Sequence, residues 1–282
     1  MNDRLEVKKT YKLYIGGAFP RSESGRTYEV HGADGSFVAN PCLASRKDLR
    51  DAVVAARTAQ SGWASATAYN RGQILYRIAE MMEGRSGQFA SEISQLDGVT
   101  KSKAMSEVNT AIDRWVWYAG WSDKLSVIAG STNPVSGPYY NFTIPEPMGV
   151  VGALATEEKS LLGLVNAIAP IIVSGNTTVA LASTRAPLPA ITFAEVLATS
   201  DLPPGVCNIL TGKSNELAPW FASHMDINAL DISGIQEPSD IADIKVAGAQ
   251  NLKRIHAFTE SATPQRILAF MESKTIWHPI GI

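Results

Sequence analysis

The sequence has few of the residues on which many functional sites are built. Among its 282 residues there are only two cysteines, Cys42 and Cys207, and four histidines. Two cysteines are too few for a disulfide framework, and neither has a histidine or another cysteine at metal-ligand spacing. The sequence therefore predicts neither a disulfide scaffold nor a metal site.

Charge and hydrophobicity exclude two further classes of partner. The formal net charge is only −2 and no block of like charges occurs, so a nucleic-acid or anionic-membrane partner has no electrostatic support. The longest apolar run, residues 161–173, contains Asn166 and Pro170 and is too short to cross a bilayer. The first residues carry no apolar segment like that of a secretory signal. We therefore expect a cytoplasmic protein with neither kind of partner.

The first half of the chain indicates short strands followed by helices. Residues 11–38 are rich in glycine, serine and arginine, which is typical of short strands and turns. Helical periodicity begins after Ser45, which forms an approximate capping box with Asp48, although aspartate replaces the usual glutamate or glutamine. The spacing of apolar residues predicts three amphipathic helices, around residues 46–63, 74–82 and 108–118.

The second half alternates between strands and helices. Short apolar or β-branched runs predict strands at residues 150–155, 177–182, 206–210 and 229–232. Helical segments are predicted at residues 161–173, with a disturbance at Pro170, and at 187–198, 214–223 and 241–249. Strands alternating with helices imply right-handed βαβ crossovers. The predicted fold class is therefore α/β, with a doubly wound parallel sheet covered by helices on both faces.

Two segments do not fit this alternation. Residues 134–148 combine proline, glycine and aromatic residues with a period of two, which predicts an exposed strand or hairpin that leaves the main body. Residues 266–282 begin with helix-compatible spacing. They then read as a strand at residues 274–277, and Pro279 stops it.

Several phrases, taken together, resemble the aldehyde dehydrogenase superfamily. They are YIGGAF near residue 14, YAGWSDKL from Tyr118, GPYYNFTIPEPMGVVGAL from Gly137, and then SGNTTVAL and LPPGVCNILTG. No single phrase is decisive, but the resemblance covers roughly residues 11–254.

The resemblance implies a domain organisation. Residues 1–133 and 149–265 would form the Rossmann-like cofactor domain, and residues 134–148 and 266–282 would form a small β oligomerisation element. In the family, the stretch matching residues 251–254 leads into the catalytic domain. Here only the segment to residue 282 follows, and it is similar to the family's C-terminus. We therefore expect a shortened member that lacks the catalytic domain.

The resemblance also shows that the catalytic positions are altered. The family's nucleophilic cysteine has no counterpart, because the domain that carries it is absent. Cys207 lies in an apolar strand and is interpreted as a buried core thiol, and nothing near Cys42 would lower its pKa. The base glutamate falls near Phe258, which cannot accept a proton, and the nearby Glu260 is interpreted as a surface carboxylate. The oxyanion asparagine corresponds to Glu158, whose charge would repel a developing oxyanion. No catalytic residue is therefore predicted.

The cofactor positions are altered as well. The lysine and the acid that contact the adenosine ribose correspond to Leu181 and Thr184, and a downstream glycine corresponds to Ser239. Ser233 and Gly234 could still offer a hydroxyl and a close backbone approach to a phosphate, although a turn with a helix cap is the favoured interpretation. We therefore expect no bound cofactor, or NAD(P) binding that is weakened.

These observations favour a pseudoenzyme. The hypothesis is a subunit that assembles with itself or, preferably, with a full-length aldehyde dehydrogenase through residues 134–148 and 266–282. Those strands would be unpaired edges in an isolated monomer. Two alternatives stay open. One is an active enzyme, with its catalytic domain supplied by another chain or with an unrelated reaction at Glu157, Glu158 and Lys159. The other is a module that senses NAD(P) without chemistry.

Overall fold

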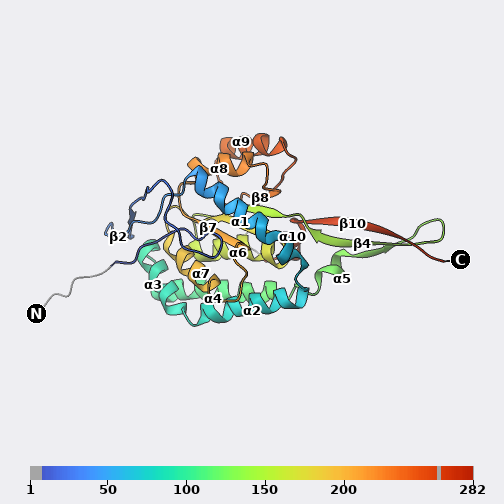
Figure 1. Cartoon of the computed structure of the whole chain (residues 1–282). Coiled ribbons are helices and arrows are strands. Elements are labelled where there is room, and N and C mark those ends of the chain that lie inside the picture. Colours follow the sequence, from blue (N-terminus) through green and yellow to red (C-terminus); the bar gives the residue numbers. More distant parts are fainter. Residues whose placement is uncertain (1–7, 259–261, 282) are drawn as a thin grey trace, which may run out of the picture.

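The computed structural model describes residues 8–258 and 262–281. They form a Rossmann-like α/β domain in which a five-stranded parallel sheet lies between layers of helices (Figure 1). A narrow three-stranded antiparallel sheet projects from one side of this body. The predicted fold class is thus confirmed.

The central sheet is doubly wound. Its strands are β5 (Val150–Leu154), β6 (Thr177–Leu181), β7 (Cys207–Leu210), β8 (Ala229–Asp231) and β9 (Arg254–His256), in the spatial order β7-β6-β5-β8-β9. Within this sheet, β5 comes first along the chain, and β6 and β7 are then added in turn on one side of it. The chain next crosses back to place β8 and β9 on the other side of β5. The order of strands therefore reverses between β5 and β8, which is where doubly wound sheets place their ligands.

Two helical layers cover the sheet. On one face lie α1 (Arg46–Ser65), α8 (Ser214–Ser223) and α9 (Pro238–Ala249). On the other face lie α6 (Ser160–Val173) and α7 (Leu188–Leu197), covered in turn by α2 (Ala68–Glu83), α3 (Ser86–Asp97) and α4 (Lys101–Ala119). Successive strand residues alternate between the two cores, so that Val150 faces α1 while Val151 faces α6. This alternation follows from the period of two in a strand.

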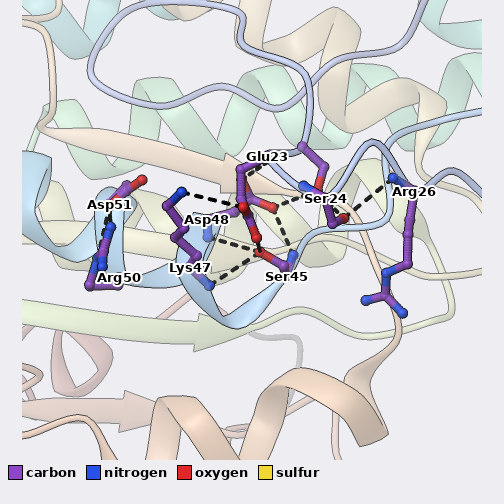
Figure 2. Close-up of polar contacts among 9 residues, drawn as sticks. Glu23, Ser24, Arg26, Ser45, Lys47, Asp48, Arg50 and Asp51 are labelled. Atoms are coloured by element: carbon purple, nitrogen blue, oxygen red, sulfur yellow. Dashed lines mark hydrogen bonds and ion pairs between the residues drawn. The ribbon is translucent and has the colours of Figure 1, made fainter.

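The predicted capping box at the start of α1 is present. The Ser45 hydroxyl accepts the backbone N–H of Asp48 at 3.2 Å, and the Asp48 carboxylate accepts the backbone N–H of Ser45 at 2.7 Å. Figure 2 shows this reciprocal pair, with Glu23 beside it. The shorter aspartate also accepts the backbone N–H of Glu23 at 3.1 Å. The cap therefore ties the N-terminal loop to the helix.

One local prediction needs correction, and two elements were not predicted. Helix α6 runs through Pro170 without interruption. Helix α3 was not predicted, although its buried residues Phe89, Ile93 and Leu96 recur at helical spacing. The fifth strand, β9, was not predicted either, because its three residues are mostly polar. Its strand conformation comes from parallel pairing with β8, and local propensity gives no sign of it.

The projecting sheet is formed largely by residues 134–148 and 266–282, the two segments that did not fit the alternation of strands and helices. Its strands are β3 (Ser131–Asn133), β4 (Tyr139–Pro147) and β10 (Met271–Pro279), in the order β10-β4-β3. Strand β10 pairs with β4 along its whole length, from Met271 opposite Pro147 to Pro279 opposite Tyr139. The expectation that both segments are unpaired edges in a monomer was therefore wrong for β4, which is the central strand, whereas β10 pairs on one side only. In the described part of the chain, the outer edges of β3 and β10 carry no partner strand.

The remaining elements are short. They are β1 (Val30–His31), β2 (Phe37–Ala39), α5 (Leu125–Ala129) and α10 (Pro264–Leu268). Helix α10 packs Ile267 into the core beside α6, and Phe270 follows it there. Across residues 8–258 and 262–281, no helix has the length and apolar character needed to cross a membrane.

Candidate functional site

The candidate site lies at the carboxyl ends of β5 and β8, where the strand order reverses. Ser233 and Gly234 follow β8, and Phe258 follows β9. Glu158 follows β5, on the loop that leads into α6. The fold thus brings Ser233, Gly234 and Phe258 together at one crevice. Leu181 and Thr184 lie one strand away, at the end of β6.

The two residues considered for phosphate binding are occupied by internal contacts. The Ser233 hydroxyl donates to the Asp231 carboxylate and accepts the backbone N–H of Phe258 at 2.9 Å. The backbone N–H of Gly234 donates to the Leu154 carbonyl at 2.9 Å. A Cβ on Gly234 would lie only 2.1 Å from the Ala155 carbonyl oxygen. Glycine is therefore required here so that two segments of backbone can approach each other, which favours the turn interpretation.

A buried ion pair lies beneath this turn. The Arg266 guanidinium is 3.4 Å from the Asp231 carboxylate, and the two side chains are 4% and 0% exposed. Burial raises the pKa of Asp231, and the charge of Arg266 opposes that rise. Arg266 also lies over the Phe258 ring, 4.7 Å from its centroid, and Phe258 in turn stacks on His256. Side chains from the end of the chain thus close the crevice from one side.

What remains of the crevice is a cavity of about 20 Å³. A single water needs on the order of 10–15 Å³ by such a measure, so the space holds one water and no nucleotide. The cavity borders Asn166, whose side-chain amide is buried without a hydrogen-bond partner in the described residues. This cavity by itself is too small for a dinucleotide.

Glu157 lies on the loop that follows β5 and contacts the neighbouring loop at the end of β6. Its carboxylate accepts the Ser183 hydroxyl at 2.6 Å and the backbone N–H groups of Thr184 and Arg185 at 3.0 and 3.1 Å. The Thr184 hydroxyl donates to a carbonyl on the next loop, and Leu181 is buried in the core. The Glu157 carboxylate therefore satisfies hydrogen-bond donors that an anionic ligand would otherwise use. These contacts give Glu157 a structural role.

The other candidate residues are dispersed. Glu158 is exposed, Glu260 lies outside the described residues, and Ser239 is exposed in the first turn of α9. Both cysteines are free and buried, and burial raises the pKa of the Cys207 thiol far above its usual range. No group of three or more histidine, cysteine or acidic side chains that could hold a metal occurs in the part of the chain that the structure describes.

A separate groove lies between α8 and α9. It has a volume of about 280 Å³ and is lined by apolar atoms of Ala218, Pro219 and Ile244, with Asp240 and Asp243 beside them. Such a groove accommodates a flat uncharged ring. Its two carboxylates would repel the phosphates of a nucleotide. The groove thus combines an apolar lining with two acidic side chains.

Sequence reasoning did not identify the Asp231–Arg266 pair. Both residues stand inside apolar stretches, Asp231 at the end of ALD and Arg266 before ILAF. Charged residues are rarely buried unless they are paired. Two opposite charges in apolar surroundings could therefore have indicated the pair, although nothing in the sequence indicates that these two meet.

Comparisons with known proteins agree on the relatives of this chain. The model of the aldehyde dehydrogenase family matches residues 19–274. Retinal dehydrogenase 2 of Homo sapiens is 34% identical over 270 residues, which cover 94% of this chain and 51% of that protein. Cytosolic 10-formyltetrahydrofolate dehydrogenase of Mus musculus is 32% identical over 94% of this chain and 30% of that protein.

Solved structures show the same relationship. PnpE from Pseudomonas sp. WBC-3 superposes with a TM-score of 0.84 and is 26% identical, covering 88% of this chain and 50% of that protein. An NAD+ complex of aldehyde dehydrogenase from Bacillus cereus superposes with a TM-score of 0.81 at 26% identity, covering 88% of this chain and 50% of that one. The chain thus spans about half the length of these proteins and of the retinal dehydrogenase.

Proposed function

Because this chain belongs to the aldehyde dehydrogenase family, we propose that it is a catalytically inactive member that acts as a structural or regulatory subunit, assembled with a full-length aldehyde dehydrogenase. The observation that carries the proposal is the filled crevice. The Asp231–Arg266 pair and Phe258 leave about 20 Å³ at the point where a doubly wound sheet binds its ligand.

The chemistry of the remaining candidate residues supports the proposal. Aldehyde oxidation through a thiohemiacetal needs a thiolate, an acceptor for hydride and a base that activates water. The Cys207 thiol is fully buried and its raised pKa disfavours the thiolate. At the position that the resemblance gives to the oxyanion amide, Glu158 offers a negative charge instead of a donor.

The projecting sheet supports a role in assembly. It carries exposed aromatic side chains near its tip, with Tyr139, Tyr140 and Trp277 between 42% and 58% exposed. Tyr139 and Trp277 pack edge to face with their ring centroids 5.7 Å apart. Exposed aromatic residues are enriched in protein interfaces, and the unpaired outer edges of β3 and β10 can accept a further strand. A partner would cover both features.

Co-expression tests this proposal. We expect the chain to purify as a defined hetero-oligomer with a full-length aldehyde dehydrogenase of the same genome, when the mass of the purified species is measured by native mass spectrometry. Trp277→Ala should weaken the complex, because Trp277 lies at the tip of the sheet, whereas Tyr69→Ala is a matched control on α2 with a 71% exposed side chain. Recovery of the chain only by itself, with every dehydrogenase tested, would contradict the proposal.

The same complex separates an inactive subunit from the alternative in which a partner completes an active site. Aldehyde oxidation per partner subunit should equal or fall below that of the partner alone if this chain contributes no catalytic group. A catalytic gain that disappears when Glu158 or Glu157 is replaced would instead assign chemistry to this chain.

A nucleotide-binding module is the second candidate function, and the groove between α8 and α9 favours it. We expect calorimetric titration with NAD+ to show no saturable binding up to about 1 mM, which corresponds to a binding free energy weaker than about −4 kcal/mol. The filled crevice and the carboxylates beside the groove are the physical reasons. Saturation well below that concentration, abolished by substitutions in α8 or α9, would establish the module and overturn the expectation.

A further inference from the structure

A separate cavity lies between the start of α1 and the end of α8. Its volume is about 590 Å³, within the range of small-molecule sites. None of its lining residues lines the crevice or the groove between α8 and α9. Near the start of α1 it is bordered by Arg46, Lys47 and Arg50, and Glu23 is the one acid among the described residues that line it. The lining therefore has a surplus of positive charge.

Two of these cations are paired with carboxylates. The Lys47 ammonium lies 3.3 Å from the Glu23 carboxylate, and the Arg50 guanidinium lies 2.7 Å from that of Asp51 (Figure 2). Both pairs are exposed, and exposed ion pairs are weak, so a bound anion can compete for both cations. The positive charge comes from side chains, because the Ser45 hydroxyl already accepts the backbone N–H of Lys47 at 3.2 Å.

Arg46 is held by stacking instead of by an acid. Its guanidinium lies over the indole of Trp220, 4.0 Å from the ring centroid. This guanidinium forms no ion pair or hydrogen bond with any other residue that the structure describes. Stacking uses the flat face of a guanidinium and leaves the N–H donors at its edge free. The donors of Arg46 are therefore oriented by Trp220 and available to an anion.

The end of α8 adds a neutral donor and an apolar surface. The Nδ1 atom of His224 accepts the backbone N–H of Asp226 at 3.2 Å, so the proton of the neutral ring is on Nε2. Burial lowers the pKa of His224 from its usual value, so the ring stays neutral at pH 7. The side chains of Met225 and Trp220 line the same cavity and are exposed. An anion bound by Arg46 would therefore have apolar surface close by.

We propose that this cavity binds a phosphate monoester with an apolar group, the phosphate on Arg46 and the apolar group against Trp220 and Met225. A phosphate monoester carries a charge of about −1.5 to −2 at pH 7, which suits a surplus of positive charge better than the single charge of a carboxylate. Arginine binds phosphate oxygens through two parallel hydrogen bonds, and His224 Nε2–H is a further donor. The site does not depend on the proposed function, and its ligand binds without reaction.

Isothermal titration calorimetry of the full chain with phenyl phosphate tests the proposal. We expect saturable binding of phenyl phosphate, weaker binding of inorganic phosphate because it lacks the apolar group, and no saturation with phenol because it lacks the charge. Backbone amide NMR shifts should centre on residues 45–50 and 220–225. The proposal is overturned if phenyl phosphate does not saturate the wild-type chain, or if inorganic phosphate or phenol binds as tightly.

Three variants assign the binding to these residues. Arg46→Gln should weaken phenyl phosphate binding about tenfold or more, the effect of losing one charge-assisted contact. Arg46→Lys keeps the charge and loses the fork, so its affinity should be intermediate. Glu23→Gln removes the carboxylate of the lining and should tighten binding severalfold. The matched control is Arg77→Gln, since Arg77 lies on α2 and pairs with Glu80 at 2.8 Å. Unchanged affinity in both Arg46 variants, or weaker binding in Glu23→Gln, would refute the site.

Discussion

Replacement of Arg266 by methionine is expected to lower the free energy of unfolding by about 3–5 kcal/mol, because it leaves the buried Asp231 carboxylate without its counter-charge. The two side chains are 4% and 0% exposed, so water cannot take the place of the guanidinium. Methionine fills much of the same apolar volume, which makes the lost charge the main change. Urea unfolding followed by tryptophan fluorescence measures the effect.

The loss should depend on pH. Burial raises the pKa of Asp231 above its ordinary value of 3.8, and Arg266 opposes that rise, so the pKa in Arg266→Met is raised further. An acid with a raised folded pKa contributes stability below its unfolded pKa, and this contribution is lost as the pH rises through the folded pKa. The destabilisation should therefore be small near pH 4 and larger at pH 7.

A second substitution provides the control for the ion pair. Asp231→Asn removes the buried charge and keeps an oxygen that can accept from Ser233. The double variant Asp231→Asn with Arg266→Met should recover part of the loss and should lose its dependence on pH. If Arg266→Met costs the same at both pH values, or less than about 1 kcal/mol, the pair is not the electrostatic contact described here.

Gly234→Ala is expected to lower the free energy of unfolding by at least about 1–3 kcal/mol, the usual cost of forcing extra atoms into a packed interior. The added Cβ would lie 2.1 Å from the Ala155 carbonyl oxygen and 2.6 Å from that of Leu154. Both neighbours are backbone at the end of β5 and cannot rotate away. Thermal and urea unfolding of the purified variant measure the cost.

A glycine-to-alanine substitution at Gly62 should change the free energy of unfolding in the opposite direction. Gly62 lies within α1, and nothing lies within 4 Å of a Cβ placed on it. Gly62→Ala should therefore raise the free energy of unfolding by about 0.5–1 kcal/mol, because alanine loses less backbone entropy in a helix. Equal stabilities for the two variants would show that Gly234 does not hold the turn against β5. It would reopen a role for this glycine in phosphate binding.

The predictions for Arg266 and Gly234 concern the same crevice on which the proposed function rests. If Arg266 and Gly234 hold the crevice closed, addition of NAD+ should not raise the unfolding temperature of the wild-type chain, since a ligand stabilises only the state that it binds. A subunit of this kind would then act through its surfaces, among them the projecting sheet (Figure 1).

Much of the fold could be predicted because its signals are local. The capping box of Ser45 and Asp48 lies within four residues, and the apolar face of α1 repeats with the period of the helix. Strands β5 to β8 are short apolar runs between turns, and such runs are typical of parallel strands buried on both faces. The alternation of strands and helices then leaves few possible topologies.

Local signals were absent where the predictions failed. Nothing in residues 254–256 indicates a strand, and β9 exists because β8 offers it an unpaired edge. The helix period of α3 was present in Phe89, Ile93 and Leu96 but was not used. The candidate site was predicted residue by residue through the resemblance, and it was the geometry that showed Ser233, Gly234 and Glu157 to be bound by their own chain.

The sequence by itself therefore determined the α/β class, the order of the main elements and the membership of the family, because each depends on periodicity or on short sequence motifs. Only the tertiary structure decided that β10 pairs with β4 in the same chain, and that Arg266 meets Asp231 in the crevice. Those contacts join residues that are 35 or more positions apart. Which residues meet depends on burial, on charge pairing and on backbone hydrogen bonding in the folded chain. No local sequence pattern indicates these contacts.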